Sequence, residues 1–261
     1  MNPAVQARTR SGRAAWILGG VLLYLLFLIL QMPVAWLIAR LPADGPVQLR
    51  QASGTPWQGA VRQVIWQADV DRIDVGSFAW RWRPGELLNG RVGFNFELKK
   101  SANQLNGVVL LARNSLALNN VRGQVDAALL GFASRPLGLL QPQGTLGLDV
   151  ADLFLTRKRI HGAVRLDWRN ARSGMVAAPL GDYRAELKSA PDGRRARVDV
   201  LTVQGPLAMT GHAEYLPGQV PQGTLRLTPP PDASGKVYRP LLDILGRPNA
   251  GGTWVLFFNP H

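Results

Sequence analysis

The sequence predicts a mainly β protein, in which one N-terminal transmembrane helix precedes a large antiparallel, curved β-sheet or β-sandwich-like domain with little helix. An uncharged apolar segment near the N-terminus predicts the helix. Short alternating segments, separated by many of the 28 glycines and 19 prolines, predict strands and turns. We therefore divide the chain into a basic tail (1–13), a transmembrane helix (14–39) and a β-rich body (40–261).

The apolar segment covers residues 14–39, a run of 26 residues without a charged side chain. About 20 apolar residues in a helix cross the hydrocarbon core of a bilayer. A cleaved signal peptide, the alternative, has a shorter apolar stretch and a small-residue cleavage site, which this segment does not offer. We therefore expect an uncleaved anchor, with a local distortion of the helix near Gln31 and Pro33.

Flanking residues predict the orientation of this anchor. Arg8, Arg10 and Arg13 precede it, and the positive-inside rule places such residues in the cytoplasm. Trp16 and Trp36 lie near its two ends, where indole rings prefer the level of the lipid headgroups. The body is therefore expected on the far side of a membrane that the chain crosses once.

The body has the sequence pattern of an antiparallel meander. In the segment 78–83, Phe78, Trp80 and Trp82 alternate with Ala79 and arginines, so three aromatic rings share one face of a strand. One short helix is expected at 240–245, which begins with a proline and ends before a glycine. Further strands are expected at 61–66, 91–98, 107–111, 125–130, 145–150, 163–168, 183–187, 197–203, 208–215, 223–227 and 253–258.

Two phrases recur in the body. The phrase P-Q-G-T-L at 142–146 returns at 221–225, and G-A-V-R at 59–62 returns at 162–165. The two pairs are spaced differently along the chain, so they indicate a type of strand used several times and not a tandem duplication.

The formal net charge is +13, and the first forty residues contribute four arginines and no acid. The remaining excess of nine positive charges is compatible with an anionic membrane surface, nucleic acid or an acidic partner. An arginine-rich coding composition accounts for the same excess. We expect no nucleic-acid partner, because the basic residues are dispersed along the body.

The sequence contains no recognisable catalytic constellation. Cysteine is absent, and His161, His212 and His261 are not spaced as zinc ligands. The acids Asp69, Asp71 and Asp74 crowd one turn without the remaining ligands of a calcium loop. We therefore expect no catalytic residue, no metal, no cofactor and no enzymatic activity.

Several phrases of the chain resemble a known family. The run 49–60 reads L-R-Q-A-S-G-T-P-W-Q-G-A, which is similar to the S-G-T-x-W-x-G stretch of the type II secretion system protein N family (general secretion pathway protein N). The run W-R-W-R-P-G-E-L-L-N-G-R at 80–91 is similar to its W-x-x-x-P-x-x-L-L-x-G phrase. The segments 180–183, 241–246 and 254–256 resemble later parts of the family in the same order.

This resemblance implies a non-enzymatic accessory component of the bacterial type II secretion system. Such a protein would be anchored in the cell inner membrane by a single pass, with a cytoplasmic N-terminus and a periplasmic domain that contacts other secretion components. An unpaired sheet edge and the apolar tail 254–258 are the expected contact surfaces. The candidate motif or contact residues are Ser53, Gly54, Thr55, Trp57, Gly59, Trp80, Trp82, Trp254, Phe257 and Phe258.

Other interpretations of the same residues stay open. The run 53–59 could be a turn that places Trp57 in the core, with Pro56 excluded from a central strand. The tail 254–258 could be a last strand that closes the core. A looser resemblance to periplasmic proteins of the AsmA and lipopolysaccharide-export kind implies a lipid-handling protein, whose curved sheet offers an apolar groove to acyl chains.

Overall fold

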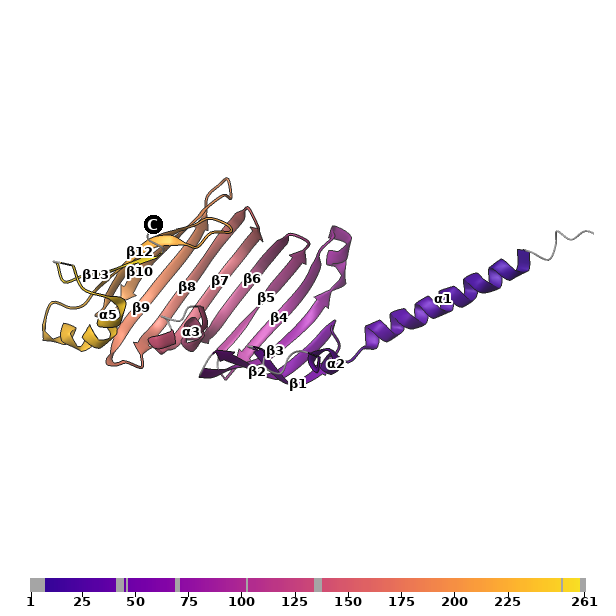
Figure 1. Ribbon diagram of the computed structural model, residues 1–261, viewed down its shortest axis with the longest axis horizontal. Helices are drawn as coiled ribbons and strands as arrows, with labels where there is room; N and C mark the ends of the chain where they lie inside the picture. Colours follow the sequence, from indigo (N-terminus) through magenta and orange to yellow (C-terminus); the bar gives the residue numbers. More distant parts are fainter. Residues whose placement is uncertain are drawn as a thin grey trace, which may run out of the picture.

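The computed structural model describes residues 8–40, 45, 47–68, 71–101, 103–133, 138–249 and 251–258. Two helices precede the sheet, α1 (Arg8–Gln31) and α2 (Val34–Ile38). Met32 and Pro33 between them are not helical. Figure 1 shows α1 projecting away from the sheet. Within the described part of the chain, none of the helices combines the length and the apolar character needed to cross a membrane.

The rest of the described chain is built on one antiparallel sheet of thirteen strands, whose spatial order is their order in the sequence (Figure 1). The prediction of one large antiparallel meander is thus confirmed. The strands are β1 (Val47–Gly54), β2 (Gln58–Ala68), β3 (Asp71–Arg83), β4 (Val92–Lys100), β5 (Asn103–Ala112), β6 (Ser115–Asp126), β7 (Pro142–Thr156), β8 (Ile160–Ser173), β9 (Val176–Ser189), β10 (Ala196–Gln204), β11 (Ala208–Tyr215), β12 (Gln222–Thr228) and β13 (Trp254–Phe258).

One face of the sheet is apolar from its first strand to its last. Residues that face each other across paired strands lie on the same side of the sheet, so the register defines rows that cross it. One row takes one residue from each strand and contains only apolar side chains and glycine. From β1 to β13 it consists of Ala52, Val61, Phe78, Leu98, Leu105, Gly123, Leu148, Leu166, Ala185, Val200, Gly211, Leu225 and Leu256.

The neighbouring row lies on the opposite face and is polar through most of its length. From β1 to β13 it consists of Ser53, Ala60, Ala79, Glu97, Asn106, Arg122, Asp149, Arg165, Glu186, Asp199, His212, Thr224 and Phe257. Charges of opposite sign pair across strands, as in Arg122 with Asp149 and Arg165 with Glu186, each at 3.2 Å. We call these two surfaces the apolar face and the polar face.

Bulges keep the apolar residues on one side. Asn120, with φ of 51°, is an extra residue in β6 between Leu118 and Val121, which both lie on the apolar face. No strand is predicted from the sequence at 115–124, because asparagines such as Asn120 are typical of turns. The predicted strand at 125–130 is wrong, because Asp126 ends β6 and its carboxylate accepts a hydrogen bond from the N–H of Ala128, 3.0 Å away.

Helical segments cover the apolar face at one end of the sheet, which we call the helical end. The segments η3 (Ala127–Leu129) and α3 (Leu130–Ala133) follow β6, and η4 (Ala233–Tyr238) and α5 (Arg239–Leu245) follow β12. Figure 1 shows α3 and α5 along the same side of the sheet. The short helix predicted at 240–245 is confirmed by α5, which has a proline in its first turn and Gly246 after its last residue.

A compact core lies where α5 and η4 meet the apolar face. Leu241 and Leu242 of α5 pack there with Tyr183, Leu227 and Trp254 of the sheet. The Tyr183 hydroxyl lies 2.9 Å from the carbonyl oxygens of Leu180 and Leu207, and burial raises its pKa well above the usual range. The Tyr183 of the sequence phrase at 180–183 is therefore a core residue.

This core predicts the effect of shortening one buried side chain. Leu242 is fully buried on α5, whereas Ile244 on the same helix is 46% exposed. Leu242→Ala should lower the free energy of unfolding by about 2–5 kcal/mol, because it leaves a cavity in the core. Ile244→Ala should change it by about 0.5 kcal/mol or less. Urea denaturation of the full chain checks this, and equal losses in both variants would contradict the packing of α5.

Candidate functional site: the junction between α1 and the sheet

The turn between β1 and β2 contains the phrase S-G-T-P-W-Q-G at 53–59, and its local geometry explains several of these residue types. Gly54 has a φ of 91°, and a β-carbon there would approach the carbonyl oxygen of Gln58. The N–H of Thr55 donates to the Gln58 carbonyl at 2.8 Å, and the Thr55 hydroxyl accepts from the N–H of Gln58 at 3.2 Å. Pro56 lies in this turn, outside both strands, as its missing N–H predicts.

Trp80 of β3 locks this turn against the sheet. Its indole N–H donates to the carbonyl oxygen of Pro56 at 2.9 Å. Gly59 leaves the space for its ring, since a β-carbon on Gly59 would come within 2.5 Å of a ring carbon of Trp80. The turn therefore depends on Gly54 and Gly59, which have no side chain, and on Trp80 of β3.

Trp57 joins the turn to the N-terminal helix. Its indole N–H donates to the carbonyl oxygen of Ile29, 3.3 Å away, in the last turn of α1. In a continuous helix this carbonyl would accept from the N–H of residue 33, but Pro33 has none. The N–H of Met32 approaches the same oxygen at a longer 3.4 Å. Trp57 thus provides a hydrogen bond that the proline removes from the helix end.

An aromatic row continues from this contact into the apolar face. The rings of Trp57 and Trp82 lie with centroids 5.0 Å apart and planes at 46°, and Trp82 opposes Phe94 in the register of β3 and β4. Phe78 stacks near Trp80 at 6.0 Å and near Phe96 at 6.3 Å. The end of α1 therefore touches one end of the sheet, here called the tryptophan end, opposite to the helical end.

The second helix supports the same junction. α2 packs against the edge strand β1, and Val34 in it is buried. After α2, the Arg40 guanidinium lies 3.7 Å from the centroid of the Trp36 ring, a cation–π contact. Trp36 itself is exposed.

The remaining predicted residues lie apart from the junction. Trp16 is exposed on α1, and Arg8, Arg10 and Arg13 belong to α1, although their side chains lie outside the described part. Ser53 precedes Gly54, the last residue of β1, and its hydroxyl lies 3.4 Å from the Ala60 carbonyl oxygen.

The C-terminal candidates divide between the two faces of β13. Trp254 is buried on the apolar face, and its indole N–H donates to the Gly246 carbonyl at 3.1 Å. Phe257 lies on the polar face and is 64% exposed. Phe258 ends β13, and its side chain lies outside the described part.

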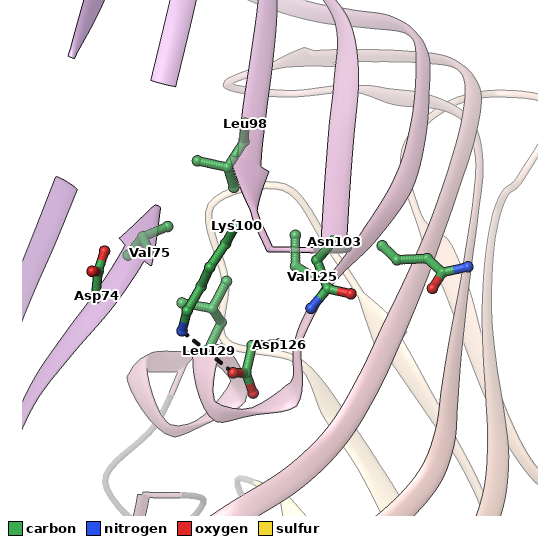
Figure 2. A pocket seen from close by; sticks show the side chains of 9 residues that line it. Asp74, Val75, Leu98, Lys100, Asn103, Val125, Asp126 and Leu129 are labelled. Carbon is green, nitrogen blue, oxygen red and sulfur yellow. Dashed lines mark hydrogen bonds and ion pairs between the residues drawn. The ribbon is translucent and has the colours of Figure 1, made fainter. Parts of the chain in front are cut away.

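Away from the junction, a functional site among the described residues would need a metal-ligand cluster or a pocket. Within them, no cluster of three His, Asp or Glu side chains could hold a metal ion. A small pocket at the helical end lies between β3, β6 and η3, and Figure 2 shows Lys100 in it pointing toward Asp126, 3.5 Å away. At its edge, a hydrogen bond from Gln63 lowers the pKa of Asp74. The charged side chains that line this pocket are Asp74, Lys100 and Asp126.

Sequence reasoning missed one partner in the junction. It singled out Trp57 and Pro33 separately, but the carbonyl of Ile29 that connects them leaves no mark in a side-chain pattern. The available signal was the proline itself, because a proline within an apolar helix frees the carbonyl four residues before it.

Comparison with known proteins gives the family. The family model described as Type II secretion system (T2SS), protein N, matches residues 45–256. The chain belongs to this family. The matched region begins after α2 and contains the turn at 53–59, Trp80, Trp82 and Trp254. Neither the curated proteins nor the solved structures contain a significant match to the chain.

Removal of one indole N–H tests the junction. Trp57→Phe keeps a ring against Trp82 but removes a hydrogen bond of about 0.5–1.5 kcal/mol to the end of α1. We expect a broader distribution of distances between spin labels on α1, at residue 22, and on the sheet, at residue 99, measured by electron paramagnetic resonance. Trp168→Phe removes an indole N–H that donates to the Gln143 carbonyl at 3.0 Å, away from the junction, so it is the control. Equal broadening in both variants would contradict the role of Trp57.

Proposed function

We propose that this component of the type II secretion system is held in the inner membrane by α1 and α2 together, with its sheet in the periplasm, and acts through contact with other secretion components. Membership of the protein N family supports the secretion system itself. The finer statements rest on the N-terminal helices and on the last strand of the sheet.

The proposed anchor rests on the apolar character of the N-terminal helices. Large apolar side chains along α1 from Trp16 to Leu30 are exposed, which is unfavourable in water and favourable in lipid. The uncharged run continues through α2, so the two helices together supply the apolar length. The arginines before residue 14 favour a cytoplasmic N-terminus.

The observation that carries the proposed contact is Phe257 on the edge strand β13. It ends a row that is polar through most of its length, and it is 64% exposed. β13 pairs with β12, and within the described part of the chain no other strand pairs with it, so its other edge can accept a partner strand. An exposed aromatic side chain beside an unpaired edge is typical of a protein interface.

Single cysteines test the proposed orientation, because the chain contains none of its own. We expect Lys99→Cys, on the polar face, to react with a membrane-impermeant maleimide in intact spheroplasts. Ser11→Cys, before the apolar run, should react only after lysis. Reaction of Ser11→Cys in intact spheroplasts, or protection of Lys99→Cys there, would contradict the orientation.

Site-specific photo-crosslinking tests the proposed contact. A benzophenone amino acid at position 257 should form an adduct with another component of the secretion apparatus, identified by mass spectrometry. The matched control is position 154, because Phe154 is a 41% exposed phenylalanine on the polar face of the central strand β7. The proposal fails if position 257 gives no such adduct, or if position 154 gives as much.

A further inference from the structure

We propose that the open part of the apolar face, on β3 to β6 at the tryptophan end, holds the acyl chains of an anionic phospholipid. Acyl chains need apolar surface and no hydrogen-bonding groups. Two rows of the face cross these strands at this end, and neither contains a charged side chain. They are Trp82, Phe94, Val109 and Leu118, and Val92, Leu111 and Leu116.

This part of the face has less cover than the rest. A sheet with one apolar face ordinarily packs a second layer against it. Here η3, η4 and α5 supply that layer at the helical end. A second buried cluster, with Val121, Val150 and Ile160, lies on β6 to β8 and reaches the tryptophan end where β8 begins. On β4 and β5 at that end, in contrast, Leu111 stays 45% exposed and Val92 38% exposed.

The junction makes this surface continuous with the proposed anchor. Trp82 begins the first of the two rows, Trp57 stacks on Trp82, and Trp57 bonds to Ile29 in the last turn of α1. An apolar path therefore leads from the exposed side chains of α1 to the face of the sheet. This continuity favours membrane lipid over a soluble protein as the occupant, and the inference rests on the proposed function for the position of α1.

Charge at the same end favours an anionic headgroup. The hairpins after β5, β7 and β9 all lie at the tryptophan end, because connections alternate between the two ends of a meander. Anionic lipids attract such clusters of lysine and arginine. These hairpins carry six exposed basic residues, Arg113, Arg157, Lys158, Arg159, Arg194 and Arg195, against one acid, Asp192.

Photo-crosslinking in vesicles tests this inference with the full chain. The vesicles contain phosphatidylethanolamine and phosphatidylglycerol, with a trace of phosphatidylglycerol that carries a diazirine in its acyl chain. We expect adducts on α1 and also on β4 to β6. A matched probe with a phosphatidylcholine headgroup should give several-fold fewer adducts on the sheet, and equal yields would overturn the anionic part of the inference.

Two leucines provide the variant and its control. Leu111→Glu places a carboxylate on the apolar face and should lower the sheet adducts at least about tenfold, because the carboxylate would lose hydration beside an acyl chain. Leu201→Glu makes the same change on the polar face of β10, at a residue that is 43% exposed, and should leave them unchanged. Equal loss in both variants would overturn the assignment to this face.

The pattern of adducts separates the inference from the proposed function. Adducts confined to α1 would overturn the acyl site and leave the anchor in place. Adducts on the sheet without any on α1 would support the acyl site and contradict the anchor. Absence of adducts from both would overturn both.

Discussion

The structure depends on one constraint, which is that each strand turns most of its apolar residues to the same side of a single sheet. Side chains alternate along a strand, so a slip of one residue would exchange the two faces. The register places an apolar residue or glycine of every strand on this side, in the row from Ala52 on β1 to Leu256 on β13. Extra residues such as Asn120 are absorbed in bulges that restore the alternation, and the polar face then gathers its charges into cross-strand pairs.

The phrase at 53–59 connects α1 to the sheet through Trp57. Pro33 interrupts the helix and lacks the N–H that would donate to the Ile29 carbonyl, and the Trp57 indole N–H donates to this carbonyl. Trp57 in turn packs on Trp82, and Trp80 fastens the turn through Pro56. The phrase at 53–59 is thus a turn whose Trp57 packs within the chain, and contact of these residues with another secretion component stays a prediction.

Much of this architecture could be predicted from the sequence, because alternation and turn residues are local signals. The aromatic strand at 78–83 and the helix at 240–245 are examples. Most of β6 could not be found, because Asn119 and Asn120 have the composition of a turn and only pairing with β5 and β7 makes them part of a strand. The strand predicted at 125–130 overlaps the helical segments that begin at Ala127, because the apolar residues there fit either structure.

The candidate site was predictable in its residues but not in its geometry. Trp57, Trp80 and Trp82 stand out as large aromatic residues in glycine-rich surroundings. The hydrogen bond from the Trp57 side chain to the Ile29 carbonyl joins two segments far apart in the sequence, and its acceptor is a backbone atom that no side-chain pattern marks. The division of β13 into buried Trp254 and exposed Phe257 likewise depends on which face α5 covers.

The most direct test of a sheet with one apolar and one polar face is a spin-label scan along β5 in the full chain, reconstituted in vesicles. Labels at 105, 109 and 111 should collide mainly with oxygen, which partitions into apolar surroundings. Labels at 104, 106 and 108 should collide mainly with a water-soluble nickel complex. This account predicts that alternation with a period of two. The same preference at both sets of positions, or the opposite phase, would contradict it.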